Sequence, residues 1–219
     1  MARIKTRGFA SFLDASEFFK NDFLTIRFDL SGYGKSGGKD YEFNFQKAAG
    51  DVDSVIRFAR RNYPGKKIDI LAHSLGAFIV ALLSPSGIHK VVFTSIVNSN
   101  VRFIIKNLEE RILSKGGSID KHGLTRYPRT KGGIQLIGKG FWTTLENFKP
   151  IEYIEELGEK TDLIIFKPKQ DEVIGYKYFK EYKQLKNAKY VEMNGDHNFR
   201  NKKDRVALFE NIKSFLLKN

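Results

Sequence analysis

Ser74 stands between two apolar runs, residues 68–71 and 77–83. The residues two positions before and after it, Ala72 and Gly76, are both small. A buried strand that turns sharply into a helix presents a serine at the bend in this way. The turn is tight, so we expect any larger side chain at the two small positions to collide with the neighbouring backbone. Ser74 is therefore a candidate nucleophile, and it needs a base to take its proton.

His197 is the candidate base. It is the one histidine of the chain that follows the carboxyl end of a predicted strand, residues 190–193. The others are His73 inside the turn, His89 before a predicted strand, and His122 in a long segment between strands. A neutral imidazole accepts a proton near neutral pH, so His197 would take the proton of Ser74 as the serine attacks.

Asp171 is the candidate acid, because it follows the end of the predicted strand at residues 163–166. It would hold the imidazole in the productive tautomer and stabilise the imidazolium. Asp196 is a weaker candidate, since a residue next to the histidine in sequence usually projects away from the ring. Glu172 is the fallback acid. The backbone N–H of Leu75, at the start of a helix, would donate to the oxyanion of the reaction.

These residues require strands and helices that alternate along the chain. The predicted strands are residues 24–30, 68–71, 91–97, 163–166 and 190–193, and the predicted helices are residues 48–59, 75–83, a short helix after Pro150, 176–185 and 206–216. Such alternation is typical of an α/β fold with a mostly parallel sheet and helices on both faces. The length of 219 residues fits a single domain, residues 1–219.

Residues 98–150 interrupt this pattern, because they are far longer than an ordinary crossover connection. We interpret them as an insertion that begins with a helix at residues 101–113. A glycine-rich stretch with aromatic residues follows. Two of these, Phe141 and Trp142, are candidate walls of a substrate-binding pocket, or they simply pack the insertion.

Composition limits the other classes of function. Hydrophobic residues make up 41% of the chain, and the mean hydropathy is −0.38. No run reaches the roughly 18 apolar residues of a membrane span, and residues 1–5 do not resemble a signal peptide. We therefore expect a cytoplasmic protein with no membrane partner. The absence of cysteine excludes disulfides, thiolate metal sites and a cysteine nucleophile, and we expect no metal or other cofactor.

The net charge of +13 is unevenly distributed. Between residues 111 and 139 the chain has one acidic residue, Asp120, against a set of basic ones: Arg111, Lys115, Lys121, Arg126, Arg129, Lys131 and Lys139. They form a solvated surface or attract anionic substrates, such as carboxylate-bearing esters or acyl-CoA. A nucleic-acid partner is not expected, because aromatic residues are not interleaved with the cations.

Residues 32–37 match the pattern G-x-G-x-x-G of phosphate-binding loops. The residues that follow do not open a helix whose N-terminus would face a pyrophosphate. Gly34, Lys35 and Ser36 also mimic the end of a Walker A loop, but that loop needs a glycine where Asp29 stands. The sequence therefore does not favour nucleotide binding.

Four segments together resemble the α/β-hydrolase superfamily, and more narrowly its lid-bearing branch with cinnamoyl and feruloyl esterases. Residues 28–36 match the signature Asp-x-Arg-Gly-x-Gly-x-Ser, with Ser31 where arginine is usual. Residues 140–153 resemble the end of the lid, and residues 170–174 and 195–199 match the acid and base segments. The resemblance implies a catalytic triad in the order serine, acid, histidine, and a lid insertion at about 98–150.

The N-terminus departs from that family. Its members have an apolar strand that ends in His-Gly, followed by the residue whose N–H completes the oxyanion hole. The matching residues here are 4–9, so Phe9 takes this role by resemblance, Arg7 replaces the histidine, and the strand is polar. By the same comparison we expect the usual N-terminal strand pair to be missing. We therefore expect an imperfect oxyanion hole.

These observations predict a serine hydrolase that cleaves small carboxylic esters, with anionic esters among the candidate substrates, through an acyl-enzyme intermediate. An acyl thioesterase would need the same parts. A catalytically weak hydrolase-fold binding protein is the alternative from another class of function.

Overall fold

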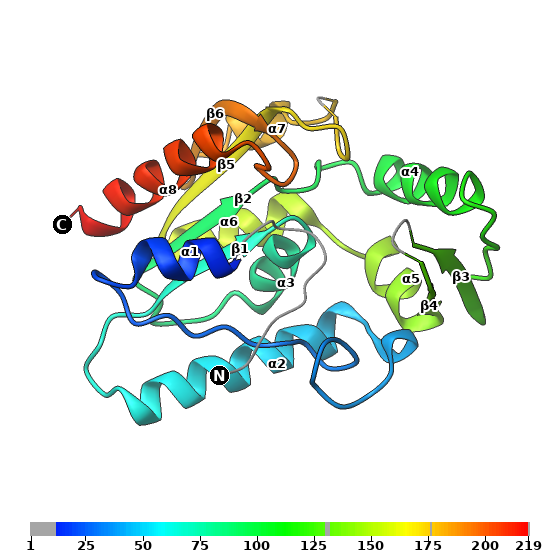
Figure 1. Cartoon of the computed structure of the whole chain (residues 1–219), viewed down its shortest axis with the longest axis horizontal. Helices are drawn as coiled ribbons and strands as arrows, with labels where there is room; N and C mark the ends of the chain where they lie inside the picture. Colours follow the sequence, from blue (N-terminus) through cyan, green and yellow to red (C-terminus); the bar gives the residue numbers. More distant parts are fainter. Residues whose placement is uncertain (1–11, 130–131, 176, 219) are drawn as a thin grey trace.

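Four parallel strands form the main sheet of the computed structural model, which describes residues 12–129, 132–175 and 177–218. Their order in the sheet is β1-β2-β5-β6 (Figure 1). The strands are β1 (Asp69–His73), β2 (Lys90–Thr94), β5 (Asp162–Gln170) and β6 (Lys189–Asp196). Every pairing in this sheet is parallel, so all four strands end on the same edge. The candidate site residues follow three of these ends.

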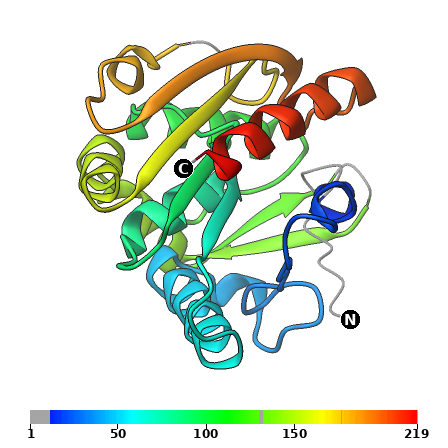
Figure 2. The same ribbon diagram turned by 90° about the vertical axis from the view of Figure 1, so that its left-hand side faces the viewer.

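The central strands are buried on both faces, as their nearly continuous apolar sequence predicts. Val91 and Phe93 of β2 belong to the hydrophobic cluster under one set of helices, whereas Val92 between them belongs to the cluster on the other face. Helices α2 (Phe45–Asn62), α3 (Leu75–Leu83) and α6 (Pro150–Lys160) cover the first face. Helices α1 (Phe12–Phe19) and α8 (Lys202–Leu217) cover the other (Figure 2).

Local signals set the ends of two of these helices. The side chain of Asn44 accepts a hydrogen bond from the backbone N–H of Lys47 and caps α2, and Asn201 caps α8 in the same way through Lys203. Helix α2 ends just before Pro64 and Gly65, which favour a turn. Helix α7 (Lys180–Lys183) lies between β5 and β6 and is only four residues long, so the helix predicted at residues 176–185 is much shorter than expected.

Residues 98–150, called the insert below, form a small unit of their own. Helix α4 (Val101–Leu113) confirms the helix predicted there, and it is followed by the antiparallel hairpin of β3 (Leu124–Pro128) and β4 (Ile134–Gly138) and by α5 (Lys139–Glu146). This hairpin was not predicted from the sequence. The insert shares the hydrophobic cluster of α2 and α3. A short helical turn, η1 (Asp40–Glu42), also packs against β4, since the N–H of Leu136 donates to Asp40 at 3.0 Å.

The predicted α/β fold is confirmed, but the strand predicted at residues 24–30 is wrong. A strand exists only through hydrogen bonds to a neighbouring strand, and within the described residues this segment pairs with none. Its carboxyl end is held by α2 instead, where Asp51 accepts from the backbone and hydroxyl of Ser31 at 2.7 and 2.8 Å. The N-terminal strand matched to residues 4–9 lies outside the described residues. Among the helices of the described part, none combines the length and apolar character needed to cross a bilayer.

Candidate active site

Ser74 occupies a strained turn between β1 and α3. Its φ of 53° and ψ of −123° lie in a region that residues other than glycine rarely adopt. The turn is fixed because the N–H of Ser74 donates to the carbonyl of Thr94 on β2 at 2.9 Å. A Cβ on Gly76 would lie 3.9 Å from the Cβ of Ala72, which is ordinary van der Waals contact. The expected collision with the backbone is therefore wrong for a single methyl group, and the nearest neighbour of that position is a side chain.

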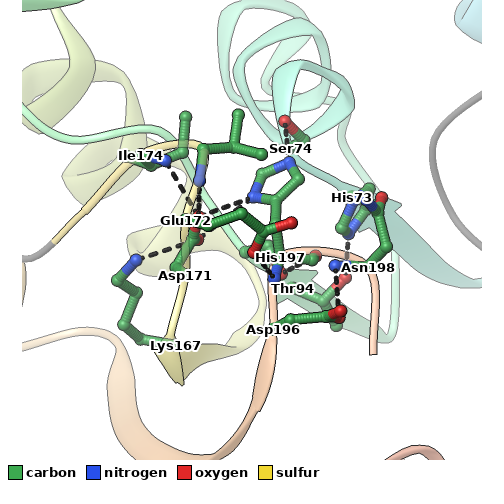
Figure 3. A network of polar contacts seen from close by, with 12 residues as sticks. His73, Ser74, Thr94, Lys167, Asp171, Glu172, Ile174, Asp196, His197 and Asn198 are labelled. Carbon is green, nitrogen blue, oxygen red and sulfur yellow. Dashed lines mark hydrogen bonds and ion pairs between the residues drawn. The ribbon is translucent and has the colours of Figure 1, made fainter. Parts of the chain in front are cut away.

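His197 contacts both Ser74 and Asp171, although 123 residues separate the serine from the histidine. Its Nε2 lies 3.1 Å from Oγ of Ser74, and its Nδ1 lies 3.0 and 3.1 Å from the two carboxylate oxygens of Asp171 (Figure 3). The ring is nearly buried, with 6% of the residue exposed. The structure thus brings the three residues predicted from strand ends into one hydrogen-bonded chain.

Asp171 is buried yet well supplied with donors. Its Oδ1 accepts from the backbone N–H groups of Val173 and Ile174 at 3.0 and 2.9 Å, and its Oδ2 accepts from Nζ of Lys167 at 2.9 Å. Burial by itself would raise the pKa of Asp171. The hydrogen bond and charge of His197, then the Ile174 N–H and the Lys167 ammonium, outweigh burial and lower the pKa to about 2. The carboxylate therefore stays ionised at neutral pH.

The two alternative acids point elsewhere. Asp196 accepts from the backbone N–H groups of Asn198 and Arg200 and from the Arg200 guanidinium. Glu172 accepts from the backbone N–H of His197 at 3.1 Å. Asp171 is thus the carboxylate in contact with the imidazole, and Glu172 holds the loop that carries it.

Two further polar residues support the histidine, and neither contact was predicted from the sequence. The hydroxyl of Ser95, buried at the end of β2, donates to the carbonyl of His197 at 2.7 Å. The ring of His73 lies 5.0 Å from the ring of His197, and its Nδ1 is 3.0 Å from Oγ1 of Thr94. Burial, and then the neighbouring His197, lower the pKa of His73 to about 3, so His73 is neutral at physiological pH. Nothing in the local sequence marks either contact.

A cavity of about 190 Å³ opens beside Ser74, between the main sheet and the insert. Leu75 and Phe141 line it. Trp142 does not, so its predicted role as a pocket wall is wrong: the residue is 1% exposed, and its indole N–H donates to the hydroxyl of Thr125 inside the insert at 3.1 Å. An indole whose N–H is satisfied this way stabilises the packing of the insert.

The cavity is apolar over much of its wall but carries two arginines, Arg111 of α4 and Arg129 after β3. The guanidinium of Arg129 stacks on the ring of Tyr127, 4.3 Å from its centroid, and hydrogen-bonds Gln135. Asp40 also lines the cavity. Of the other basic residues noted between positions 111 and 139, those that the structure describes are not among its lining residues: Lys115, Lys121, Arg126 and Lys139.

Of the two predicted oxyanion donors, only one lies within the described residues. Leu75 is the first residue of α3, and the N–H groups of the first helical turn have no partner within the helix. Its backbone is therefore placed beside Ser74 as predicted. Phe9, the second predicted donor, lies outside the described residues.

The glycine-rich loop is closed on itself by an aspartate. The carboxylate of Asp29 accepts from the N–H of Lys35 at 2.8 Å, and a Cβ on Gly34 would lie 2.1 Å from it. Helix α2 begins only at Phe45, well after the loop. The carboxylate of Asp29 thus fills the turn in which a phosphate would have to lie.

Comparison with known proteins agrees with this architecture. A family model described as "Serine aminopeptidase, S33" (Hydrolase_4) matches residues 10–109. The structure of Est1E from Butyrivibrio proteoclasticus with ferulic acid bound is similar, with a TM-score of 0.69 and 19% identity over 93% of this chain and 80% of that one. The chain has the α/β-hydrolase fold. The resemblance to α/β-hydrolases that the sequence motifs indicated is thus confirmed for the fold.

Two other solved structures extend the comparison. A monoacylglycerol lipase from Paleococcus ferrophilus has a TM-score of 0.63 and 17% identity over 94% of this chain and 88% of that one. Alpha/beta hydrolase domain-containing protein 10 from mouse has a TM-score of 0.64 and 18% identity over 92% and 81%. At these identities the likeness is one of fold. No curated protein sequence matches the chain.

Proposed function

We propose that the chain is a serine hydrolase that cleaves carboxylic esters through an acyl-enzyme intermediate. The observation that carries this proposal is the continuous contact from Asp171 through His197 to Ser74, at the wall of a cavity. A buried carboxylate, an imidazole and a serine hydroxyl in this order make the serine nucleophilic at neutral pH. The hydrolase family model and the esterase and lipase neighbours support the same class of reaction.

The contacts suggest each step of acylation. Nε2 of His197 takes the proton of Ser74 as Oγ attacks the ester carbonyl, and Asp171 stabilises the resulting imidazolium. The N–H of Leu75 donates to the negatively charged carbonyl oxygen of the tetrahedral intermediate. The imidazolium then gives its proton to the departing alcohol, and the acyl group remains on Ser74.

Deacylation repeats these roles with water in place of the serine. His197 takes a proton from the water, the hydroxide attacks the acyl carbonyl, and the proton returns to Oγ of Ser74 as the carboxylic acid leaves. Each cycle thus consumes one ester and one water, and it yields one alcohol and one acid.

The cavity indicates where the substrate lies. Its apolar wall suits the hydrocarbon part of an acyl group, and Phe141 contributes an aromatic surface there. Arg111 and Arg129 suit an anionic group on the substrate, such as a second carboxylate. We propose that the insert acts as a lid, because it supplies one side of this cavity while Ser74 and Leu75 supply the other.

Labelling with a fluorophosphonate tests the nucleophile directly. The wild-type chain should be labelled and should hydrolyse at least one member of a panel of nitrophenyl esters and acyl-CoAs. Ser74→Ala should lose labelling and about 10⁴ to 10⁶ of the rate, whereas Ser54→Ala, on the exposed side of α2, should lose neither. Labelling that persists in Ser74→Ala would rule out this nucleophile. Faster turnover of the acyl-CoAs than of the esters would favour a thioesterase, and a wild-type chain whose Ser74 is not labelled would favour the catalytically weak binding protein.

A further inference from the structure

Lys167 is a charged residue in the interior of the sheet. It lies on β5, and only 2% of its side chain is exposed. Its ammonium lies 2.9 Å from Oδ2 of Asp171 and 4.3 Å from the ring centroid of Phe179. Lysines are almost never fully buried unless they are paired. The partner here is the candidate acid itself.

The geometry places a positive charge close to the imidazole. The same oxygen, Oδ2 of Asp171, contacts both Nζ of Lys167 at 2.9 Å and Nδ1 of His197 at 3.1 Å. The ammonium and the ring nitrogen are therefore no more than about 6 Å apart, with the carboxylate between them. Figure 3 shows the lysine on the side of Asp171 that faces away from the ring.

We propose that Lys167 is a positioning residue of this site, which fixes the carboxylate of Asp171 and extends the hydrolysis reaction to lower pH. The inference rests on the proposed function. The first effect follows from the hydrogen bond: Oδ2 is held by the ammonium while Oδ1 is held by the N–H groups of Val173 and Ile174, so the carboxylate has no freedom to rotate away.

The second effect follows from the charge. A cation at this distance disfavours a second positive charge beside it, so loss of the lysine's charge should move the pH profile of hydrolysis to higher pH. Burial lowers the pKa of the Lys167 ammonium, and the charge and hydrogen bond of Asp171 oppose that effect. Coulomb's law over about 6 Å, with an effective dielectric constant between about 20 and 80, gives an effect of roughly 0.5 to 2 pH units.

Other titratable groups face Lys167, Asp171 and His197 from the elements packed around these residues. They are His73 on β1, Lys169 on β5, Glu172 after β5, Tyr178 before α7, Lys180 and Lys183 on α7, Tyr190 and Glu192 on β6, and Asp196 and Arg200 beside His197. All of them remain in place when Lys167 alone is replaced. A comparison of variants at this one position therefore isolates the effect of its charge.

The chain offers a matched control for the loss of a buried lysine. Lys90 of β2 is 3% exposed, and its ammonium donates to the carbonyl groups of Phe215 and Leu216 at the end of α8. It begins β2, at the edge of the sheet opposite the strand ends that carry the site. Its replacement removes an interior cation without touching Asp171.

The experiment compares the wild type with Lys167→Met, Lys167→Gln, Lys167→Arg and Lys90→Met. Two quantities are measured against pH: kcat/KM for a neutral nitrophenyl ester, and the ¹⁵N chemical shifts of the His197 ring. Both neutral variants at position 167 should move the midpoint of each profile up by about 0.5 to 2 pH units. Lys167→Arg keeps the positive charge, so its midpoints should stay close to those of the wild type. Lys90→Met should lower the unfolding temperature without moving either midpoint.

Midpoints in the folded neutral variants that stay within about 0.3 pH units of the wild type would overturn the inference. Glutamine can still donate a hydrogen bond to Asp171, so it keeps the test open should the methionine variant not fold. The ring titration does not depend on turnover. A shifted titration in a chain that hydrolyses no ester would overturn the proposed function alone, and normal hydrolysis with unshifted midpoints would overturn this inference alone.

Discussion

His73 should make the stability of the fold depend on pH well above the range in which carboxylates titrate. It lies at the end of β1, and burial followed by the nearby charge of His197 lowers its pKa from 6.5 to about 3. In the folded chain this ring therefore stays neutral at pH 5. In the unfolded chain the same ring binds a proton below about pH 6.5.

The sign of the effect follows from this difference. The folded-state pKa is lower than the unfolded one, so the contribution to stability is complete above about pH 6.5 and is lost progressively as the pH falls towards 3. One pH unit inside this window corresponds to about 1.4 kcal/mol. Between pH 7 and pH 5 the linkage of His73 should therefore lower the free energy of unfolding by about 2 kcal/mol. Asp171, with its pKa lowered to about 2, contributes only below about pH 4.

Urea unfolding at pH 7 and pH 5 measures this difference. His73→Gln removes the titrating ring and should reduce the loss of unfolding free energy between the two pH values by about 2 kcal/mol, whatever its stability at pH 7. His122→Gln, at an exposed position of the insert, is the matched control and should behave as the wild type. Equal losses in the wild type and His73→Gln would show that the ring is protonated in the folded state and would refute the reasoning.

The other predictions concern activity. Asp171→Asn should lower kcat by about 10⁴ because the ring loses its orienting carboxylate. Asp196→Asn, measured with the same ester, should lower kcat much less. A larger loss in Asp196→Asn than in Asp171→Asn would assign the acid to Asp196. Arg111→Gln and Arg129→Gln should lower kcat/KM for carboxylate-bearing esters and spare neutral esters, whereas Arg126→Gln, which does not line the cavity, should affect neither. An equal loss for both kinds of ester would indicate that the arginines only support the insert.

Sequence reasoning located the main candidate site because the fold converts order along the chain into position. Parallel strands present their carboxyl ends at one edge of a sheet, so residues that follow three predicted strands were expected to meet. Ser74, Asp171 and His197 lie together for this reason. The apolar runs that marked those strands also decided the fold class, since a strand buried on both faces cannot alternate polar and apolar residues.

The pairing of strands and the packing of side chains between distant segments could not be predicted from the order of elements along the chain. Residues 24–30 have a strand-like sequence, but a strand also needs a partner, and the described residues supply none. The sequence left Trp142 open between a pocket wall and the packing of the insert. The structure decides for packing, since the residue is buried and its indole N–H donates to Thr125.

The sequence by itself determined the α/β class, the order of the elements and the three residues at the strand ends, since these depend on local periodicity and chain order. Only the tertiary structure decided that Lys167 faces Asp171, that Ser95 holds the loop of His197, and that Arg111 and Arg129 line the cavity. A lysine in a strand or an arginine in an insertion has many possible partners. The partner is selected by which elements pack together, and that depends on contacts between residues far apart in the sequence.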